Sequence, residues 1–249
     1  MKLVTFLNHS QRRLGVLFDT FIIDLVTAAA FCFSTTQKYQ DFSKACASMM
    51  SLLNHWEHQC DNLNLVFEKI TQAVKLDRQK WLSNGSVVTA SEVQLLAPVP
   101  FPGKVICVAE NFPKPGKTHK PDYPTIFLKP SSTVTSLNQP VFLTDLTQAV
   151  SIEVELALVI NKASRHISVD EAFSSIAGYI LANDIGDMLL EQRTSQWTSG
   201  KMFDSFTPMG PWLVTKDEID FKHGLEMTST INGEIVQSGI TAEMFFSPA

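Results

Sequence analysis

Cysteine is scarce in this chain, and its few cysteines form no metal-binding motif. Four cysteines occur among 249 residues, and no two of them make a Cys-x-x-Cys pair. Their wide spacing favours free thiols over a zinc site or a disulfide framework. We therefore expect a reducing compartment, the cytoplasm, with reduced thiols at Cys32, Cys46, Cys60 and Cys107.

Long apolar runs and dense basic patches are also missing. The mostly apolar run at residues 21–34 is too short to span a bilayer and contains Asp24. The N-terminus lacks the charged-then-apolar layout of a signal peptide. The formal net charge is −5, without a basic cluster of the kind that binds nucleic acid. We expect a soluble protein that binds neither membrane nor nucleic acid.

The pattern along the chain changes near residue 85. Residues 1–25 predict two short strands joined by a hairpin at residues 8–11, and residues 36–82 predict helices. Apolar residues recur every three or four positions at Phe42, Ala45, Cys46, Met49, Met50 and Leu53, and again at Leu63, Val66, Phe67, Ile70, Val74 and Leu76. Asn84-Gly85 and three prolines then break the pattern. We predict an α+β N-terminal domain (1–85), a linker (86–102) and a mainly β domain (103–249).

Two acidic residues stand at the start of an apolar, β-branched run at residues 151–160. A strand alternates its faces, so Glu153 and Glu155 share one face and Val154 lies on the other. Two adjacent carboxylates repel each other and resist burial. Two interpretations stay open: solvated glutamates at a strand end, or oxygen ligands for a hard divalent cation.

A third carboxylate strengthens the metal interpretation. A second apolar segment, residues 178–184, ends on Asn183-Asp184. Glu153, Glu155 and Asp184 together would form half of the ligand shell that Mg²⁺ or Mn²⁺ prefers, with water and substrate oxygens completing it. Considered alone, Asn183-Asp184 is more typical of a turn or a helix N-cap.

Several motifs in order resemble the fumarylacetoacetate hydrolase family. They are residues 101–108 (FPGKVICV), 126–130 (IFLKP), 153–155 (EVE), 177–184 (AGYILAND), 200–212 (GKMFDSFTPMGPW) and 232–234 (NGE) with Gln237 and Thr241. The resemblance runs from about Leu95 to the C-terminus, and residues 1–6, 13–16 and 24–25 look like the N-terminal segment of longer members. It implies an α+β fold whose catalytic domain is a mixed, mainly β roll.

The resemblance also implies roles for particular residues. Members of the family bind Mg²⁺ or Mn²⁺, here through Glu153, Glu155 and Asp184, and act on small oxo acids through an enolate. Lys201 would stabilise that enolate, because a lysine beside carboxylates stays protonated. Lys129 and Asn183 would support or bind the substrate, although a purely structural lysine remains an alternative for Lys129. We also expect a homodimer.

Three departures from the family pattern bear on activity. The family's lid carries Gly-x-Asn-Tyr-x-x-His-x-x-Glu, but here Pro115 stands at the His position and Thr118 at the Glu position. His119 and Asp122 keep the His-then-carboxylate spacing, shifted by four residues, and are the alternative catalytic pair. Because this segment is short and rich in proline, we predict that residues 110–122 form an irregular, mobile loop and that His119 does not line the site.

The other departures concern substrate contacts and the chain end. Met188 and Glu191 replace an arginine and a glutamine that contact substrate in the family. The chain stops at residues 247–249, before the family's Gly-Thr-Pro segment, so we expect a fragment or a natural truncation with an exposed sheet edge. The resemblance implies a metal-dependent hydrolase or lyase acting on C–C bonds of oxo acids or acylpyruvates. A decarboxylase or isomerase on the same metal, or a non-catalytic member, are the alternatives.

Overall fold

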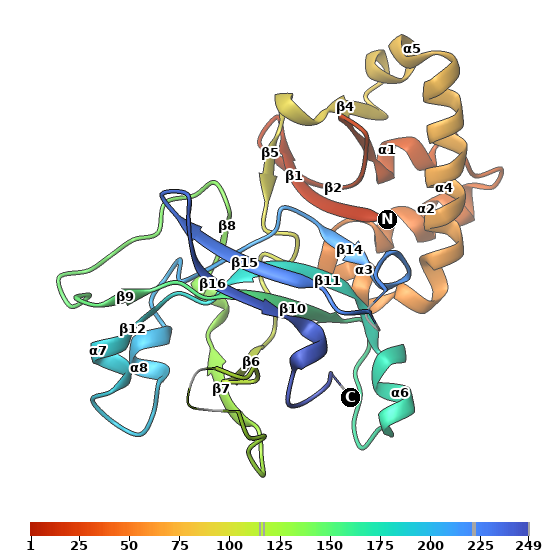
Figure 1. Cartoon of the computed structure of the whole chain (residues 1–249). Coiled ribbons are helices and arrows are strands. Elements are labelled where there is room, and N and C mark those ends of the chain that lie inside the picture. Colours follow the sequence, from red (N-terminus) through yellow and green to blue (C-terminus); the bar gives the residue numbers. More distant parts are fainter. Residues whose placement is uncertain (115, 117, 221–222, 249) are drawn as a thin grey trace.

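A single curved sheet runs through most of the molecule (Figure 1). The computed structural model describes residues 1–114, 116, 118–220 and 223–248. Among these, ten strands pair in the order β4-β3-β2-β1-β14-β11-β13-β8, with β10 beside β11 and β5 beside β1. All of these pairs are antiparallel except β13 with β8. The predicted fold class, α+β with a mixed, mainly β sheet, is confirmed.

Six strands of this sheet span three or four residues, and the other four span seven or eight. Their bounds are β1 (Lys2–Asn8), β2 (Gln11–Phe18), β3 (Phe21–Asp24), β4 (Val87–Thr89), β5 (Gln94–Leu96), β8 (Val134–Ser136), β10 (Val154–Ile160), β11 (Ile176–Asn183), β13 (Thr207–Met209) and β14 (Leu213–Thr215). Three separate two-strand ribbons are β6 (Val105–Ala109) with β7 (Thr125–Lys129), β9 (Val150–Ser151) with β12 (Gly186–Asp187), and β15 (Glu226–Ile231) with β16 (Glu234–Ile240).

The predicted hairpin at residues 8–11 is confirmed, but the N-terminal segment contains a third strand. His9 and Ser10 have positive φ values of 46° and 64°, as a two-residue turn that matches the strand twist requires. β3 lies within the apolar run at residues 21–34 and pairs with β2. Four consecutive buried residues carry no alternation, so the sequence pattern did not distinguish this strand from a helix.

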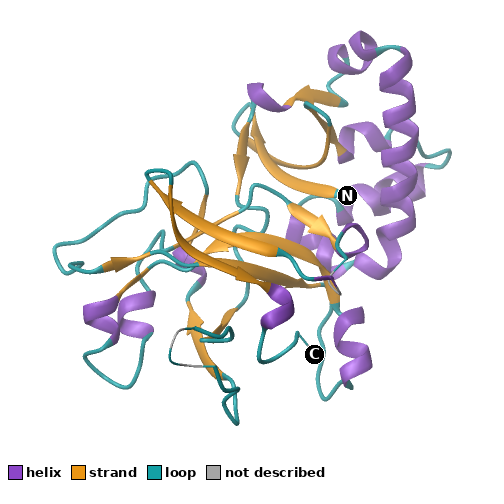
Figure 2. Ribbon diagram, in the orientation of Figure 1, coloured by secondary structure: helices purple, strands orange, loops and turns teal. Residues whose placement is uncertain are grey.

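Helices cover one end of the sheet (Figure 2). They are α1 (Leu25–Ala29), α2 (Thr36–Ala45), α3 (Met49–Asn54), α4 (Trp56–Leu76) and α5 (Arg78–Ser83). The predicted apolar stripes are buried and pack on Leu3, Val16 and Ile23 of the strands. One stripe breaks into α2 and α3, because the Ser48 hydroxyl accepts from Ser51 N at 3.1 Å and starts a new helix. The stripe prediction is wrong at Leu76, which is 90% exposed.

The sheet continues across the predicted domain boundaries. β1 pairs with β14 in the register Lys2↔Val214, and one core cluster contains both Leu3 and Leu213. Two strands, β4 and β5, fall inside the predicted linker, so much of residues 86–102 belongs to the sheet. The division into 1–85, 86–102 and 103–249 as independent units stays a prediction.

The remaining helices lie in the second half of the chain, near the ends of β10 and β11. They are α6 (Val169–Ser174), α7 (Met188–Glu191) and α8 (Thr198–Lys201). Short 3-10 turns occupy Ala90–Glu92, Ser131–Thr133, Lys216–Glu218 and Thr241–Glu243. None of the helices in the described ranges is long and apolar enough to cross a bilayer.

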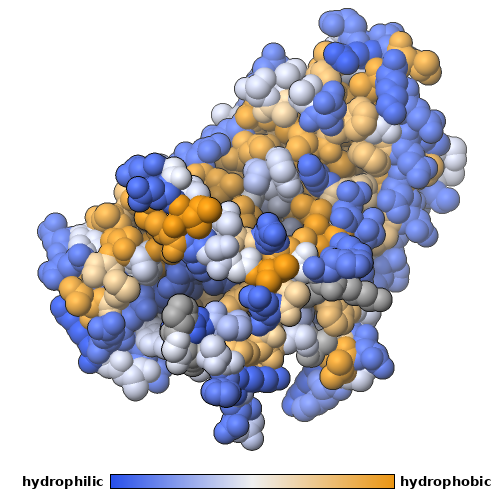
Figure 3. Space-filling model, viewed as in Figure 1, coloured by the Kyte–Doolittle hydropathy of each residue, from blue (hydrophilic) through white to orange (hydrophobic). Residues whose placement is uncertain are grey.

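Apolar side chains remain exposed on two ribbons. On β6 and β7, Ile106, Val108, Ile126 and Leu128 are 60%, 41%, 58% and 55% exposed. A hydrophobic patch also lies over the β15–β16 ribbon (Figure 3), where Ile231, Ile235 and Val236 are about half exposed or more. A polar cluster of carboxylates and lysines lies elsewhere, at the ends of β10 and β11.

Candidate active site

The ends of β10 and β11 bring the predicted carboxylates to one place. Val154 pairs with Asn183, so Glu153 and Asp184 lie just beyond the paired residues. Their backbones are joined by a hydrogen bond from Asp184 N to Glu153 O of 2.9 Å. Asn183 Oδ1 accepts from Glu153 N at 3.1 Å. The Asn183 amide therefore positions Glu153, and its predicted contact with substrate stays a prediction.

Glu155 lies one pleat into β10, opposite Ala182. Burial, together with the negative charges of Asp184 and Glu153, raises the pKa of this carboxyl to about 7, although Lys201 acts in the opposite direction. Asp184 and Glu153 thus lie close enough to Glu155 to disfavour its charged form. The expected strand begins at Val154, so Glu153 precedes β10 and does not belong to it.

Lys201 lies among these carboxylates at the end of α8, with an exposure of only 2%. Its Nζ is 2.8 Å from Glu153 Oε2 and 3.2 Å from Asp184 Oδ2. Burial disfavours the ammonium charge, but Asp184 and Glu153 outweigh burial and raise the pKa of Lys201. Lys201 is therefore a buried, protonated cation.

Lys129, the last residue of β7, is a second buried lysine in the same cluster. Its Nζ donates to Asp184 Oδ1, to Ile185 O at 3.0 Å and to Phe206 O at 2.8 Å. Burial lowers the pKa of Lys129, and the partly opposing effect of Asp184 does not restore it. All three Lys129 N–H donors are used by protein acceptors, so this lysine orients Asp184 and the backbone around it.

Glu191, at the end of α7, is a fourth carboxylate of the cluster. Its Oε1 is 3.9 Å from Lys201 Nζ, and burial raises the pKa of the Glu191 carboxyl. Two glycines make room for it. A Cβ on Gly186 would lie 2.1 Å from Glu191 Oε1, and one on Gly200 would lie 2.5 Å from Glu191 Cγ. The expectation that the glycine before Lys201 permits close approach agrees with these distances.

The donor set fits a hard divalent cation in its chemistry but not in its present arrangement. Carboxylate oxygens are the ligands that Mg²⁺ and Mn²⁺ prefer, and after burial the charges of Asp184 and Glu153 are the next causes of the raised pKa of Glu155. In the ranges that the structure describes, however, no three His, Cys, Asp or Glu side chains are grouped so as to hold a metal. The Lys201 ammonium lies between Glu153 and Asp184 instead.

The predicted lid is irregular, and the alternative catalytic pair lies outside the carboxylate cluster. Described residues in the range 110–122 form no helix and contain at most an isolated bridge. His119 and Asp122 are exposed, and no hydrogen bond joins them to each other or to any described residue. Pro115, at the family's His position, lies outside the described residues. The predicted mobility of the loop stays a prediction.

The loop is fastened at its start to the C-terminal segment. Asn111 O accepts from Phe245 N at 2.8 Å, and Asn111 Oδ1 accepts from Phe246 N at 2.8 Å. Asn111 Nδ2 in turn donates to Phe246 O at 2.9 Å. Lys120 Nζ lies 4.5 Å from the centre of the Phe246 ring. Asn111 and Lys120 therefore both contact the segment at Phe245 and Phe246.

Sequence reasoning missed Cys107 as a member of the cluster. Burial raises the pKa of its thiol to about 12, with the Asp184 charge as the next cause. Cys107 pairs with Phe127 across the β6–β7 ribbon, on the face opposite the exposed Ile106 and Val108. The sequence signal that could have identified this face is the alternation of residues 125–129, which places Phe127, the partner of Cys107, on the same face as Lys129. Met188, which stands where the family has an arginine, is 49% exposed.

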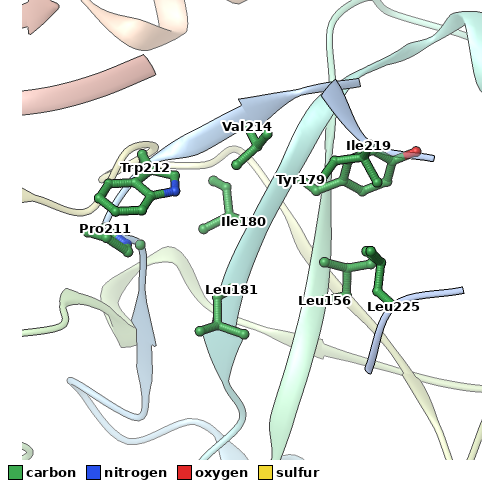
Figure 4. Close-up of a pocket in the computed structure, with 10 residues that line it drawn as sticks. Leu156, Tyr179, Ile180, Leu181, Pro211, Trp212, Val214, Ile219 and Leu225 are labelled. Atoms are coloured by element: carbon green, nitrogen blue, oxygen red, sulfur yellow. The ribbon is translucent and has the colours of Figure 1, made fainter. Parts of the chain in front are cut away.

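A separate apolar hollow of about 240 Å³ lies on the other face of β10 and β11 (Figure 4). Leu156 and Leu181, paired across the two strands, point into it together with Trp212 and Leu225. Leu156 follows Glu155, so the alternation of the strand places the hollow opposite the carboxylate cluster. The described residues of its lining include no carboxylate or lysine, and we assign the hollow no catalytic role.

Residues 104–249 match the fumarylacetoacetate (FAA) hydrolase C-terminal family. The chain belongs to the fumarylacetoacetate hydrolase family. It is 41% identical over 165 residues to mitochondrial oxaloacetate tautomerase FAHD2A of Homo sapiens, covering 64% of this chain and 52% of that protein. It is 37% identical over 156 residues to 2,4-didehydro-3-deoxy-L-rhamnonate hydrolase of Sphingomonas sp. (strain SKA58), covering 61% and 55%. The chain spans about half the length of these curated relatives.

Solved structures of the family share the fold. Maleylpyruvate hydrolase from Sphingobium sp. SYK-6, solved with manganese(II) and pyruvate, superposes with a TM-score of 0.69 at 24% identity, covering 100% of this chain and 80% of that one. 2-Hydroxyhepta-2,4-diene-1,7-dioate isomerase from Mycobacterium marinum gives a TM-score of 0.58 at 34% identity, covering 65% and 60%. These likenesses establish the architecture of this member of the family.

Proposed function

We propose that this chain is a Mg²⁺- or Mn²⁺-dependent enzyme that interconverts the keto and enol forms of a small oxo acid. The observation that carries the proposal is the buried Lys201 ammonium, which Glu153 and Asp184 hold, while the side chains of the alternative catalytic pair, His119 and Asp122, are exposed. Tautomerisation needs stabilisation of an enolate but no activated water. The relatives named oxaloacetate tautomerases support the same choice.

Each residue of the cluster has a proposed role. Glu153, Glu155 and Asp184 would hold the cation, as carboxylates suited to it. The cation would supply Lewis-acid stabilisation of the enolate. Lys201 would donate a hydrogen bond to the developing oxyanion, because a buried protonated donor is far more effective there than in water. Lys129 would keep Asp184 oriented through its three hydrogen bonds.

Cleavage of a C–C bond, as in the acylpyruvate hydrolase expected from the sequence, is the second candidate. One relative is named a hydrolase and the manganese-containing structure is that of a maleylpyruvate hydrolase. Hydrolysis requires a base that activates water, and His119 and Asp122 are exposed and unpaired among the described residues. A decarboxylase and a non-catalytic member are the remaining alternatives. The predicted homodimer and cytoplasmic location also stay proposals.

The test is an assay of the purified chain with Mg²⁺ or Mn²⁺ on oxaloacetate and acetylpyruvate. We expect enol-to-keto conversion of oxaloacetate, with Lys201→Met lowering kcat by about 10²–10³ because one oxyanion donor is lost. Lys162→Met is the matched control, since Lys162 pairs with Glu57 on the surface at 3.2 Å. Rapid acetylpyruvate cleavage that Glu153→Ala abolishes would establish the hydrolase instead. If the only reaction observed is decarboxylation of oxaloacetate, the result would favour a decarboxylase. No turnover of either substrate would favour the non-catalytic member.

A further inference from the structure

One oxygen of Glu191 is buried without a hydrogen-bond donor. Glu191 Oε1 has no hydrogen-bond partner among the described residues. Lys201 Nζ lies 3.9 Å away, beyond the length of a hydrogen bond. A buried carboxylate oxygen without a donor is costly, so its persistence calls for an explanation. A donor that reaches it in another state of the site would supply one.

Lys201 is the donor that could change partners. Its present acceptors, Glu153 and Asp184, are two of the groups that we propose bind the cation. A cation cannot take those oxygens while the ammonium occupies the space between them, because like charges repel at short range. Metal binding therefore requires a new acceptor for Lys201, within reach and also negative.

Local structure keeps Glu191 and Lys201 together. The Asp187 side chain accepts from Leu190 N at 3.0 Å and starts α7. Ser199 Oγ donates to Leu190 O at 2.9 Å and so fastens α8 to α7. A Cβ on Gly186 would lie 2.9 Å from both Cδ and Cε of Lys201. Because Gly186 has no side chain, the side chains of Lys201 and Glu191 can lie together over it.

We propose that Glu191 is a positioning residue that receives the Lys201 ammonium when Mg²⁺ or Mn²⁺ occupies Glu153 and Asp184. The inference rests on the proposed function. A charge-assisted hydrogen bond of about 2.8 Å requires Lys201 Nζ to move by about 1 Å, which rotation about the lysine side-chain bonds allows. Lys201 thereby keeps its charge compensated and remains beside the substrate position. A glutamine here would offer an uncharged and weaker acceptor.

The experiment measures Mn²⁺ affinity of the full chain by isothermal titration calorimetry, without substrate. Glu191→Gln removes the charge, whereas Glu191→Asp keeps the charge but withdraws it from Lys201. If Glu191 acts as an acceptor, both variants weaken Mn²⁺ binding by about tenfold to a hundredfold, or about 1.4–2.8 kcal/mol. If Glu191 acts only through the long-range effect of its negative charge, Glu191→Asp binds Mn²⁺ as tightly as the unaltered chain does. That result would overturn the inference.

The Lys201→Met background provides the second measurement. Without the lysine no acceptor is needed, so adding Glu191→Asp should change Mn²⁺ affinity by less than about twofold. An equal loss in both backgrounds would overturn the inference, and far-UV circular dichroism confirms that each variant is folded. If the unaltered chain binds no Mn²⁺, the proposed function fails and this inference fails with it. If the unaltered chain binds Mn²⁺ and Glu191→Asp leaves that affinity unchanged, this inference fails and the proposed function is unaffected.

Discussion

Replacing Lys129 by methionine tests whether the buried lysines are structural supports of the site. Lys129 is 3% exposed and its Nζ donates to Asp184 Oδ1, Ile185 O and Phe206 O. The acceptors lie on segments that follow β11 and precede β13, so one side chain joins β7 to both. Methionine has a similar length and retains most of the packing, which leaves the loss of the ammonium as the main change.

The expected loss of stability follows from the groups left behind. Removing one partner of a buried ion pair costs roughly 3–5 kcal/mol, because the other charge stays buried without compensation. Here Lys201 Nζ remains 3.2 Å from Asp184 Oδ2 and compensates part of that charge. We therefore expect the lower end, a loss of about 3 kcal/mol in the free energy of unfolding. For a chain of this size, that corresponds to a fall in Tm of about 6–12 °C.

Urea unfolding of the metal-free protein in EDTA measures the loss directly. Lys162→Met is the control, since its exposed ion pair with Glu57 should contribute less than about 1 kcal/mol. Asp184→Asn added to Lys129→Met should recover part of the loss, because the uncompensated charge disappears. A change below about 1 kcal/mol in Lys129→Met would refute the reasoning, since it would mean that water reaches the site and solvates Asp184.

Three further perturbations probe the site and its surroundings. In the metal-free protein the folded-state pKa of Glu155, about 7, lies above its ordinary 4.5, so the folded chain retains a proton that the unfolded chain releases. Stability should therefore fall by up to about 3 kcal/mol as the pH rises from about 4.5 to about 7, and Glu155→Gln should flatten this slope in urea titrations. Gly186→Ala should destabilise the chain by about 1–3 kcal/mol and weaken Mn²⁺ binding, because its Cβ would overlap the lysine–glutamate pair. Gly103→Ala, where nothing lies within 4 Å of the added Cβ, should be nearly neutral. Asn111→Ala should speed amide hydrogen exchange in residues 241–246, and unchanged exchange would contradict the proposed fastening of the chain end.

Local patterns predicted the parts of the fold that local interactions determine. The hairpin at residues 8–11 and the buried face of α4 follow from turn geometry and helical periodicity. The pairing of β1 with β14 does not, because it joins residues more than two hundred positions apart and no local signal encodes a partner. For the same reason, a change of composition near residue 85 did not reveal that β4 and β5 belong to the main sheet.

The site could be predicted as a set of residues but not as an arrangement. The spacing of Glu153 and Glu155 and the strand end at Asp184 identified three carboxylates that do lie together. The ion pairs of Lys201 and Lys129 depend on α8 and β7 folding against the ends of β10 and β11. The sequence analysis missed Cys107 and treated Glu191 only as a departure from the family pattern, because the burial of these two side chains depends on tertiary packing.

The charges of the cluster connect its stability to its proposed chemistry. Four carboxylates, Glu153, Glu155, Asp184 and Glu191, face two ammonium groups. Burial and the charges of Asp184 and Glu153 raise the pKa of Glu155 to about 7, so below that pH a bound proton offsets part of the negative charge of the metal-free cluster. A divalent cation would supply positive charge and displace that proton, so metal affinity should increase with pH over the range in which Glu155 titrates. Under the proposed function, a divalent cation would relieve the repulsion among the carboxylates of the metal-free cluster, and Lys201 would exchange Glu153 and Asp184 for Glu191.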